Sequence, residues 1–209
     1  PFSMTPSPKE SLPFIAISTT SGTGSQCTQA AVVSDTKSKN KITLFHAGLF
    51  PVIAIVDPEL MCSVPSGVTA ATGFDAFTHA FESFLGGRTS PMTEQMSLQA
   101  IQLVLDNLPK AIADLKNIEV RSNLAWADTL AGMCLANGGA DLPHPLGEII
   151  GGICPRIAHG DTLAIVYPAF LNYKADKAPD KFIQVANHLN LKADPGALVE
   201  AILNLFKIT

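Results

Sequence analysis

The chain has 209 residues, of which 47% are hydrophobic and 15% are charged, and its formal net charge is −4. A chain of this length and apolar content can bury one large core or two small ones. The acidic balance and the lack of any basic cluster exclude nucleic-acid binding, because nucleic-acid phosphates are bound by clustered lysine and arginine. The sequence contains no apolar run of about 18 residues, which would predict a membrane span, and no charged-then-apolar leader, which would predict secretion. We therefore expect a cytoplasmic protein.

Residues 14–57 contain short apolar, β-branched runs separated by polar or glycine-containing turns. The runs are FIAIS, AAVVSD, KITLF and PVIAIVD. This pattern is typical of strands joined by loops. We therefore predict an α/β part at residues 1–62.

The loop STTSGTGSQCT, residues 18–28, follows the first of these runs. Its glycines and small hydroxyl residues let a backbone approach a ligand closely and present N–H and O–H donors to phosphate oxygens. The loop has neither the GKS or GKT ending of a P-loop nor the GxGxxG pattern, and without context it is more often a plain turn. Lys41, in the run KSKNK, either adds positive charge to such a site or is a solvated hairpin charge.

From Pro65 onward, apolar residues recur at three- and four-residue spacing, which predicts an all-helical part at residues 63–209. The clearest helical segments are 92–106, 119–137, 161–172, 179–189 and 195–206. A further helix is predicted around GFDAFTHAFE, with Thr72 and Gly73 as its start signal.

Asp75 and His79 lie four residues apart in this helix, so they point the same way from one face. Such a pair is either an exposed contact worth about 0.2–0.5 kcal/mol or half of a divalent metal site. The segment LPHPLGEIIGGICPRIAHG adds His144 and His159, in a stretch whose glycines and prolines predict turns and short elements. The remaining histidines have no such context: we interpret His46 as a strand or loop residue and His188 as the polar side of a helix.

Together these motifs resemble the iron-containing alcohol dehydrogenase family, which has the dehydroquinate synthase-like fold. TTSGTGSQ is similar to the family's TTSGTGSE loop, and VDPEL followed by PSGVTAATGFDAFTHAFESF is similar to its DP-L and TAATG-DA-THA-E signatures. The later AHG is similar to its PHG motif. The match runs in order from about residue 14 to residue 170.

The resemblance implies hydride transfer between a small primary or secondary alcohol, or its aldehyde or ketone, and a nicotinamide cofactor, with the metal polarising the substrate oxygen. It implies one divalent iron, or zinc in some members, in a cleft between the two parts, held by Asp75, His79, His144 and His159. It implies that the dinucleotide, NAD or NADP, lies beside Thr19, Thr20, Ser21, Gly22, Thr23, Lys41 and Leu60. We also expect a homodimer or a larger homo-oligomer.

One departure from the family pattern, and one ambiguity of alignment, concern the site. Many members carry a second histidine four residues after the third ligand, where it is thought to help proton relay, and here that position is Glu148. We interpret Glu148 as a catalytic proton carrier, which would require burial to act near neutral pH; the alternative is a helix-surface glutamate. HPLG also aligns with that second histidine, which would leave no third histidine ligand. His144 is preferred as the ligand because Gly151 and Gly152 then fall in register.

A second and larger departure is length. A complete family member begins with a Rossmann-like half that carries a GGGS-type pyrophosphate loop, and it continues through further helices. The resemblance therefore implies a dehydroquinate synthase-like fold truncated at both ends, an α/β remnant followed by an all-α domain. Two alternatives to an alcohol dehydrogenase stay open: a glycerol-type dehydrogenase of the same fold, and a non-catalytic metal-binding helical fragment.

Overall fold

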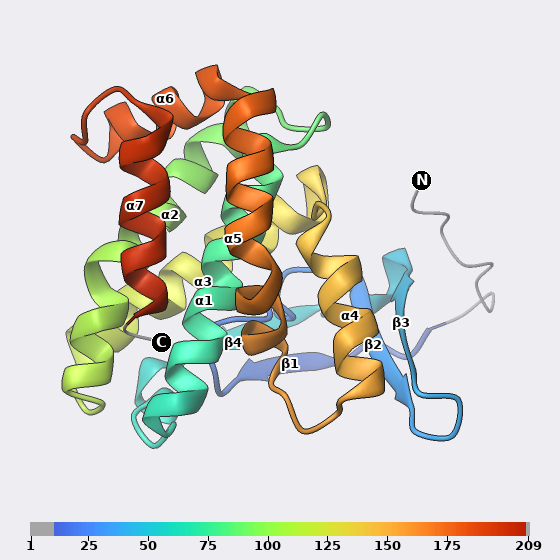
Figure 1. Ribbon diagram of the computed structural model, residues 1–209. Coiled ribbons are helices and arrows are strands. Elements are labelled where there is room, and N and C mark those ends of the chain that lie inside the picture. The colour runs from blue at the N-terminus through green and yellow to red at the C-terminus, as the bar shows by residue number, and fades with distance from the viewer. Residues whose placement is uncertain (1–10, 208–209) are drawn as a thin grey trace.

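The computed structural model describes residues 11–207, in which a strand-containing part lies beside a bundle of helices (Figure 1). The strands of this part are β1 (Ile15–Ser18), β2 (Ala30–Asp35), β3 (Asn40–Phe45) and β4 (Ile53–Val56), and two 3₁₀ turns, η1 (Ala47–Leu49) and η2 (Pro58–Met61), flank β4. The helices are α1 (Ser66–Leu85), α2 (Pro91–Ala113), α3 (Ile118–Gly138), α4 (Pro143–Ile153), α5 (His159–Lys177), α6 (Pro179–His188) and α7 (Pro195–Phe206). This order confirms the predicted fold class, whereas the domain boundary near residue 62 stays a prediction.

The strands form two separate pairs. β1 pairs in parallel with β4, and β2 pairs antiparallel with β3. All four isoleucines of β1 and β4 are between 44% and 56% exposed: Ile15, Ile17, Ile53 and Ile55. Because two-stranded sheets are marginally stable by themselves, the strand part depends on its contacts with the helices. One such contact is made by α4, which packs on β3 (Figure 1).

Helix α1 lies at the centre of the bundle, between α2, α3 and α5. Its phenylalanines Phe74, Phe77 and Phe81 are fully buried and gather around Tyr167 of α5. A helix that is apolar on nearly every side is one that is buried on nearly every side. These side chains therefore belong to the core.

The predicted start of this helix at Thr72 and Gly73 was wrong. Helix α1 begins at Ser66, with Pro65 at its N-cap, and Gly73 lies well inside it. A β-carbon at Gly73 would lie 2.5 Å from Leu108 Cδ1, so the glycine allows α2 to pack closely against α1. Its role is close approach between helices and not the punctuation of a helix end.

The stretch around His144 and His159, expected as turns and short elements, contains a turn within residues 154–158, but residues 143–153 form the helix α4. Pro143 occupies the first turn, where the missing N–H costs no helical hydrogen bond. The glycines serve packing: a β-carbon at Gly147 would lie 2.9 Å from Thr162 Oγ1, and one at Gly152 would overlap the carbonyl oxygen of Lys39. Helix α4 is thereby held between α5 and β3.

The five predicted helical segments fall on α2, α3, α5, α6 and α7. Helix α2 continues past the predicted end at residue 106 to Ala113, with Pro109 inside it. Within residues 11–207, no helix has the length and apolar character needed to cross a membrane.

Candidate metal and dinucleotide site

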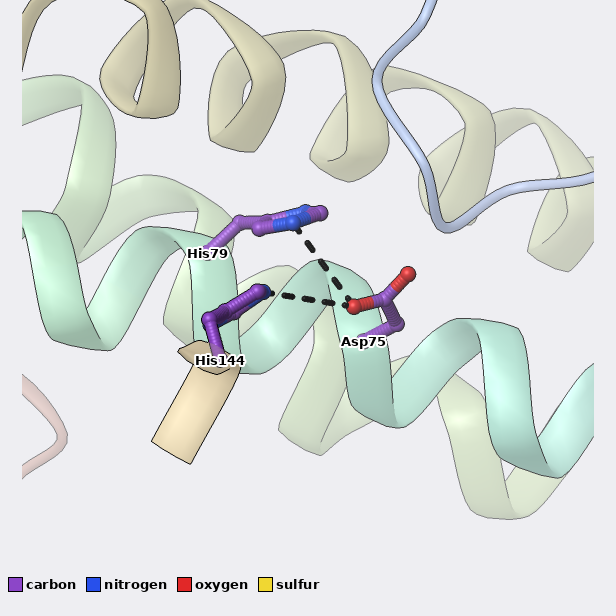
Figure 2. A group of neighbouring side chains, drawn as sticks. All are labelled: Asp75, His79 and His144. Atoms are coloured by element: carbon purple, nitrogen blue, oxygen red, sulfur yellow. Dashed lines mark ion pairs between the residues drawn. The ribbon is translucent and has the colours of Figure 1, made fainter. Parts of the chain in front are cut away.

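Asp75 and His79 share one face of α1, and both are buried. His79 Nε2 lies 3.6 Å from Asp75 Oδ1, and a dashed line in Figure 2 marks this pair. The surrounding helix is apolar, so the pair is not the exposed surface contact that the spacing alone allows. Two ligand-type side chains therefore project from the core helix into a common space.

Helices α4 and α5 add the other two histidines at their first turns. His144 Nε2 lies 3.7 Å and His159 Nε2 lies 3.8 Å from the same Asp75 Oδ1 atom. One ligand atom from each of Asp75, His79 and His144 lies within 4.8 Å of the others. The structure thus brings together all four side chains that the sequence selected. The ring of His144 lies beside Asp75 (Figure 2), where the alternative alignment of HPLG would have left no third histidine.

The chemistry of this donor set fits a divalent metal ion. Asp75 Oδ1 and His144 Nε2 are buried and have no hydrogen-bond partner within the described residues. Orphaned buried polar atoms are costly, and the separations of 3.6–3.8 Å are too long for hydrogen bonds between them. Ligand atoms about 2.1 Å from one tetrahedral ion lie roughly 3.4 Å apart, close to this spacing. A carboxylate and three imidazoles suit iron and zinc.

The second nitrogen of each imidazole is held by a neighbour. His79 Nδ1 lies 3.1 Å from the carbonyl oxygen of Gly22, and His144 Nδ1 lies 2.8 Å from Glu82 Oε2. Thr162 Oγ1 lies 3.5 Å from His159 Nδ1. A carbonyl oxygen only accepts, so His79 donates from Nδ1 and presents the Nε2 lone pair to the centre.

Glu82 is a site residue that the sequence prediction missed. It is completely buried on α1, and besides His144 it accepts a hydrogen bond of 2.7 Å from the Asp141 backbone amide. It lies seven residues after Asp75, which is two turns along the same helix face. Its spacing of three residues from His79 and seven from Asp75, on the face that carries both, was the signal that could have identified it.

The four ligand-type side chains differ in charge. Burial lowers the pKa of His79 and of His159 to about 4, so both are neutral near pH 7. Burial would also lower the pKa of His144, but the carboxylates of Glu82 and Asp75 together outweigh it and raise that pKa to about 10. Burial would raise the pKa of Asp75, but the adjacent imidazoles, His79 first, lower it to about 2. In the metal-free protein, a proton is therefore held at His144.

The cluster opens into a cavity of about 1730 Å³, larger than the roughly 300–1,000 Å³ typical of one small ligand. Of the predicted dinucleotide-binding residues, Thr23 and Lys41 line it. The others lie outside its described lining: Thr19, Thr20, Ser21, Gly22 and Leu60. Lys41 is half-buried on β3, and its positive charge contributes to lowering the pKa of His159.

Glu148 also lines the cavity, one helical turn after His144. It is half-buried, and Thr43 Oγ1 of β3 donates a hydrogen bond to its Oε1. Glu148 is therefore directed at the cavity and not at open solvent. Of the other two histidines, His46 lies at the N-cap of η1, a loop position as expected. His188, at the end of α6, has a buried Nε2 without a hydrogen-bond partner within the described residues, which does not fit the expected polar side of a helix.

Comparison with known proteins identifies the family. Residues 69–208 match the Fe-containing alcohol dehydrogenase family, C-terminal part, and residues 3–58 match iron-containing alcohol dehydrogenase. The chain belongs to the iron-containing alcohol dehydrogenase family. The predicted resemblance is thereby confirmed.

Individual members of the iron-containing alcohol dehydrogenase family align over most of this chain. It is 36% identical to the NAD-dependent methanol dehydrogenase of Bacillus methanolicus over 87% of this chain and 47% of that protein. It is 34% identical to the 1,3-propanediol dehydrogenase of Citrobacter freundii over 90% of this chain and 49% of that protein. The chain spans about half the length of the curated relatives it matches.

Solved structures give the same result for the fold. The sulfoacetaldehyde reductase of Bifidobacterium kashiwanohense in complex with NAD+ superposes with a TM-score of 0.89 and 32% identity, over 96% of this chain and 53% of that one. A 1,3-propanediol oxidoreductase superposes with a TM-score of 0.87 and 32% identity, over 94% of this chain and 53% of that one. The strands and helices described above are therefore those of the family fold.

Proposed function

We propose that the protein is a metal-dependent alcohol dehydrogenase that transfers a hydride between a small alcohol or aldehyde and NAD or NADP. The observation that carries the proposal is the convergence of Asp75, His79, His144 and His159 on one point, with two buried ligand atoms left without partners. Membership of the iron-containing alcohol dehydrogenase family supports iron as the metal, with zinc as the other candidate.

Some side chains would bind the metal ion, and others orient the side chains that bind it. Asp75 supplies the negative charge and the three imidazoles supply neutral nitrogen donors once the proton at His144 has left. Glu82 and the Gly22 carbonyl fix the rings of His144 and His79. A divalent ion held there supplies a Lewis acid for the substrate oxygen, while the nicotinamide carries the hydride.

Proton transfer is assigned to Glu148. It faces the cavity one turn from His144, and its hydrogen bond from Thr43 holds the carboxylate in place. We expect a Glu148→Gln enzyme to show an altered pH–rate profile, because an amide cannot carry the proton. An unchanged profile would remove Glu148 from the mechanism and leave the proton to water.

The cofactor and assembly assignments follow the same proposal. We infer that the dinucleotide lies beside Thr19, Thr20, Ser21, Gly22, Thr23, Lys41 and Leu60. Two of these residues, Thr23 and Lys41, line the cavity, which supports this inference. The two family matches stop at residue 58 and resume at residue 69, which supports separate parts at 1–62 and 63–209. A small alcohol or aldehyde substrate, a homo-oligomer and a cytoplasmic location complete the proposal.

Metal analysis of the purified chain beside its Asp75→Ala and His144→Ala variants tests the site. We expect about one divalent ion per chain, lost in both variants, because each substitution removes a ligand. Stoichiometric metal in His144→Ala would show that His144 is not a ligand. NADH oxidation with short aldehydes, in the protein expressed from its complete gene, tests the activity. Bound metal without turnover would favour the non-catalytic alternative.

A further inference from the structure

Asp128 of α3 is a buried carboxylate that holds the loop between β1 and β2. It is 1% exposed; its Oδ1 accepts a hydrogen bond of 2.9 Å from the Gly24 amide, and its Oδ2 accepts one of 2.9 Å from Gln26 Nε2. Gln26 in turn accepts from Ser18 Oγ, at the end of β1, at 3.0 Å. The pair therefore connects the strand part to helix α3 through hydrogen bonds that are nearly closed to water. We call these two side chains the Gln26–Asp128 clasp.

The loop lies directly against α3 at the clasp. A β-carbon at Gly24, whose φ is +60°, would lie 2.6 Å from Gly132 Cα, and one at Gly132 would lie 2.6 Å from Cys27 Sγ. Only glycine allows this approach and this backbone conformation at Gly24. The loop backbone has no spare space on the side of α3, so a change in its hydrogen bonds with Asp128 should shift the whole loop and not a single residue.

The same loop reaches the metal site two residues earlier. The Gly22 carbonyl oxygen accepts from His79 Nδ1 at 3.1 Å, which fixes the ring so that Nε2 faces Asp75. A β-carbon at Gly22 would lie 2.6 Å from Thr72 Cβ of α1, so the loop is wedged between α1 and α3. The position of Gly22 thus depends on the hydrogen bonds made at Gly24 and Gln26.

Gln26 and Asp128 are complementary, because a neutral amide donor faces a carboxyl acceptor. Gln26 is an uncharged amide. A glutamate at this position would place a second carboxyl group against buried Asp128, whose pKa burial already raises to about 7, and two ionised carboxylates there would be strongly unfavourable without a shared proton or a cation. Gln26 instead offers an amide donor to Asp128 and a carbonyl acceptor to Ser18.

We propose that Gln26 and Asp128 are positioning residues for the metal centre: the clasp sets the loop, the loop sets the Gly22 carbonyl, and the carbonyl sets the His79 imidazole. This inference rests on the proposed function, since it assumes a metal ion at the four-residue cluster. Outer contacts of metal-binding histidines typically change metal affinity by about 10–100-fold. The clasp acts one step further out, so its loss is expected to weaken metal binding by about tenfold.

The test compares Zn²⁺ affinity, measured by chelator competition, in four forms of the purified chain: the unchanged chain, Asp128→Ala, Gln26→Glu and the double variant Gln26→Glu/Asp128→Asn. Asp128→Ala and Gln26→Glu should each bind Zn²⁺ about tenfold more weakly. The double variant should recover most of the affinity, because the amide introduced at position 128 would accept from Gly24 and donate to the carboxylate introduced at position 26. The visible absorption spectrum of bound Co²⁺ should change and recover in parallel, since it reports the arrangement of the ligands.

Asn123→Ala is the matched control. Asn123 lies on the same helix and donates to Asn107 of α2 at 3.1 Å, away from the loop. Its removal should lower stability and leave Zn²⁺ affinity unchanged, which separates positioning from general loosening of α3.

The outcomes separate this inference from the proposed function. An unchanged chain that binds no Zn²⁺ would overturn both. Zn²⁺ binding that survives Asp128→Ala and Gln26→Glu undiminished would overturn the clasp alone, as would a Gln26→Glu defect that Asp128→Asn fails to repair. Where Asp128→Ala does not fold by circular dichroism, Gln26→Glu and its double variant decide the result. Recovery of folding together with Zn²⁺ binding in the double variant supports the clasp.

Discussion

The helical part and the strand part of this molecule are stabilised in different ways. In the helical part, α1 is enclosed by its neighbours and its phenylalanines lie in one continuous apolar core. In the strand part, the isoleucines of β1 and β4 are about half exposed, and the loop between β1 and β2 is held by polar contacts with α3. Apolar burial thus dominates one part, and specific hydrogen bonds position the other.

The candidate metal site combines the two. Its four ligand-type side chains come from α1, α4 and α5 in the helical part, while the carbonyl that orients His79 comes from the strand part. Damage to the core should therefore reduce stability first. Damage to the polar contacts should reduce metal affinity first.

The largest expected effect is on the core. Phe77 is fully buried and stacks on Phe81 at a centroid distance of 5.4 Å. Phe77→Ala should lower the free energy of unfolding by about 3–5 kcal/mol, because it removes a large side chain and leaves a cavity. Ile17→Ala, at a site that is 56% exposed on β1, should change it by only about 0.5 kcal/mol. Equal losses in urea denaturation would contradict the contrast between the two parts.

Glu82 tests the polar contacts within the helical part. Glu82→Ala removes the acceptor for His144 Nδ1 and should weaken Zn²⁺ binding by about 10–100-fold. Glu82→Gln keeps an acceptor at that position and should cost less. Chelator competition measures both variants. If alanine and glutamine behaved alike, the orientation of His144 would not be the reason for the loss.

The protonation of His144 predicts a pH dependence of metal binding. His79 and His159, with pKa values near 4, are already neutral above about pH 5, whereas His144, with a pKa near 10, carries a proton. Metal binding must displace that one proton, so affinity should rise with pH, by about tenfold per pH unit between about pH 6 and pH 9.

Glu82→Gln should flatten this slope, because it removes one of the two carboxylates, Glu82 and Asp75, that raise the pKa of His144. Titration calorimetry in buffers of different ionisation enthalpy would count the released proton directly. Release of no proton near pH 7 would show that His144 is neutral before the metal arrives.

The sequence predicted the elements better than their contacts. Strands and helices follow from local periodicity, and the four ligand-type residues follow from motifs, so both could be predicted from the sequence. The α4 helix was missed because the glycines around His144 resemble turn residues, although they serve close packing against Thr162 and Lys39. That role exists only once the neighbouring elements are in place.

The outer contacts of the site could not be predicted for a related reason. Glu82 and His144 are separated by 62 positions, and Gln26 and Asp128 by 102. Each is an ordinary polar residue until folding brings its partner near. A buried carboxylate is costly unless it is satisfied, so the structure identifies these groups by their partners and not by their spacing.

The smallest expected effect distinguishes two glycines within α1. Gly73 faces Leu108 in the core, whereas a β-carbon at Gly67, in the exposed first turn, would meet nothing within 4 Å. Gly67→Ala should stabilise the protein by up to about 1 kcal/mol, because alanine favours the helix over the unfolded chain. Gly73→Ala has the same helical preference but forces Leu108 out of position, and should destabilise by about 1–2 kcal/mol. Thermal unfolding of both variants measures the difference in sign. Stabilisation by both substitutions would mean that α1 and α2 can separate without cost, and that the core is less tightly packed than its buried phenylalanines imply.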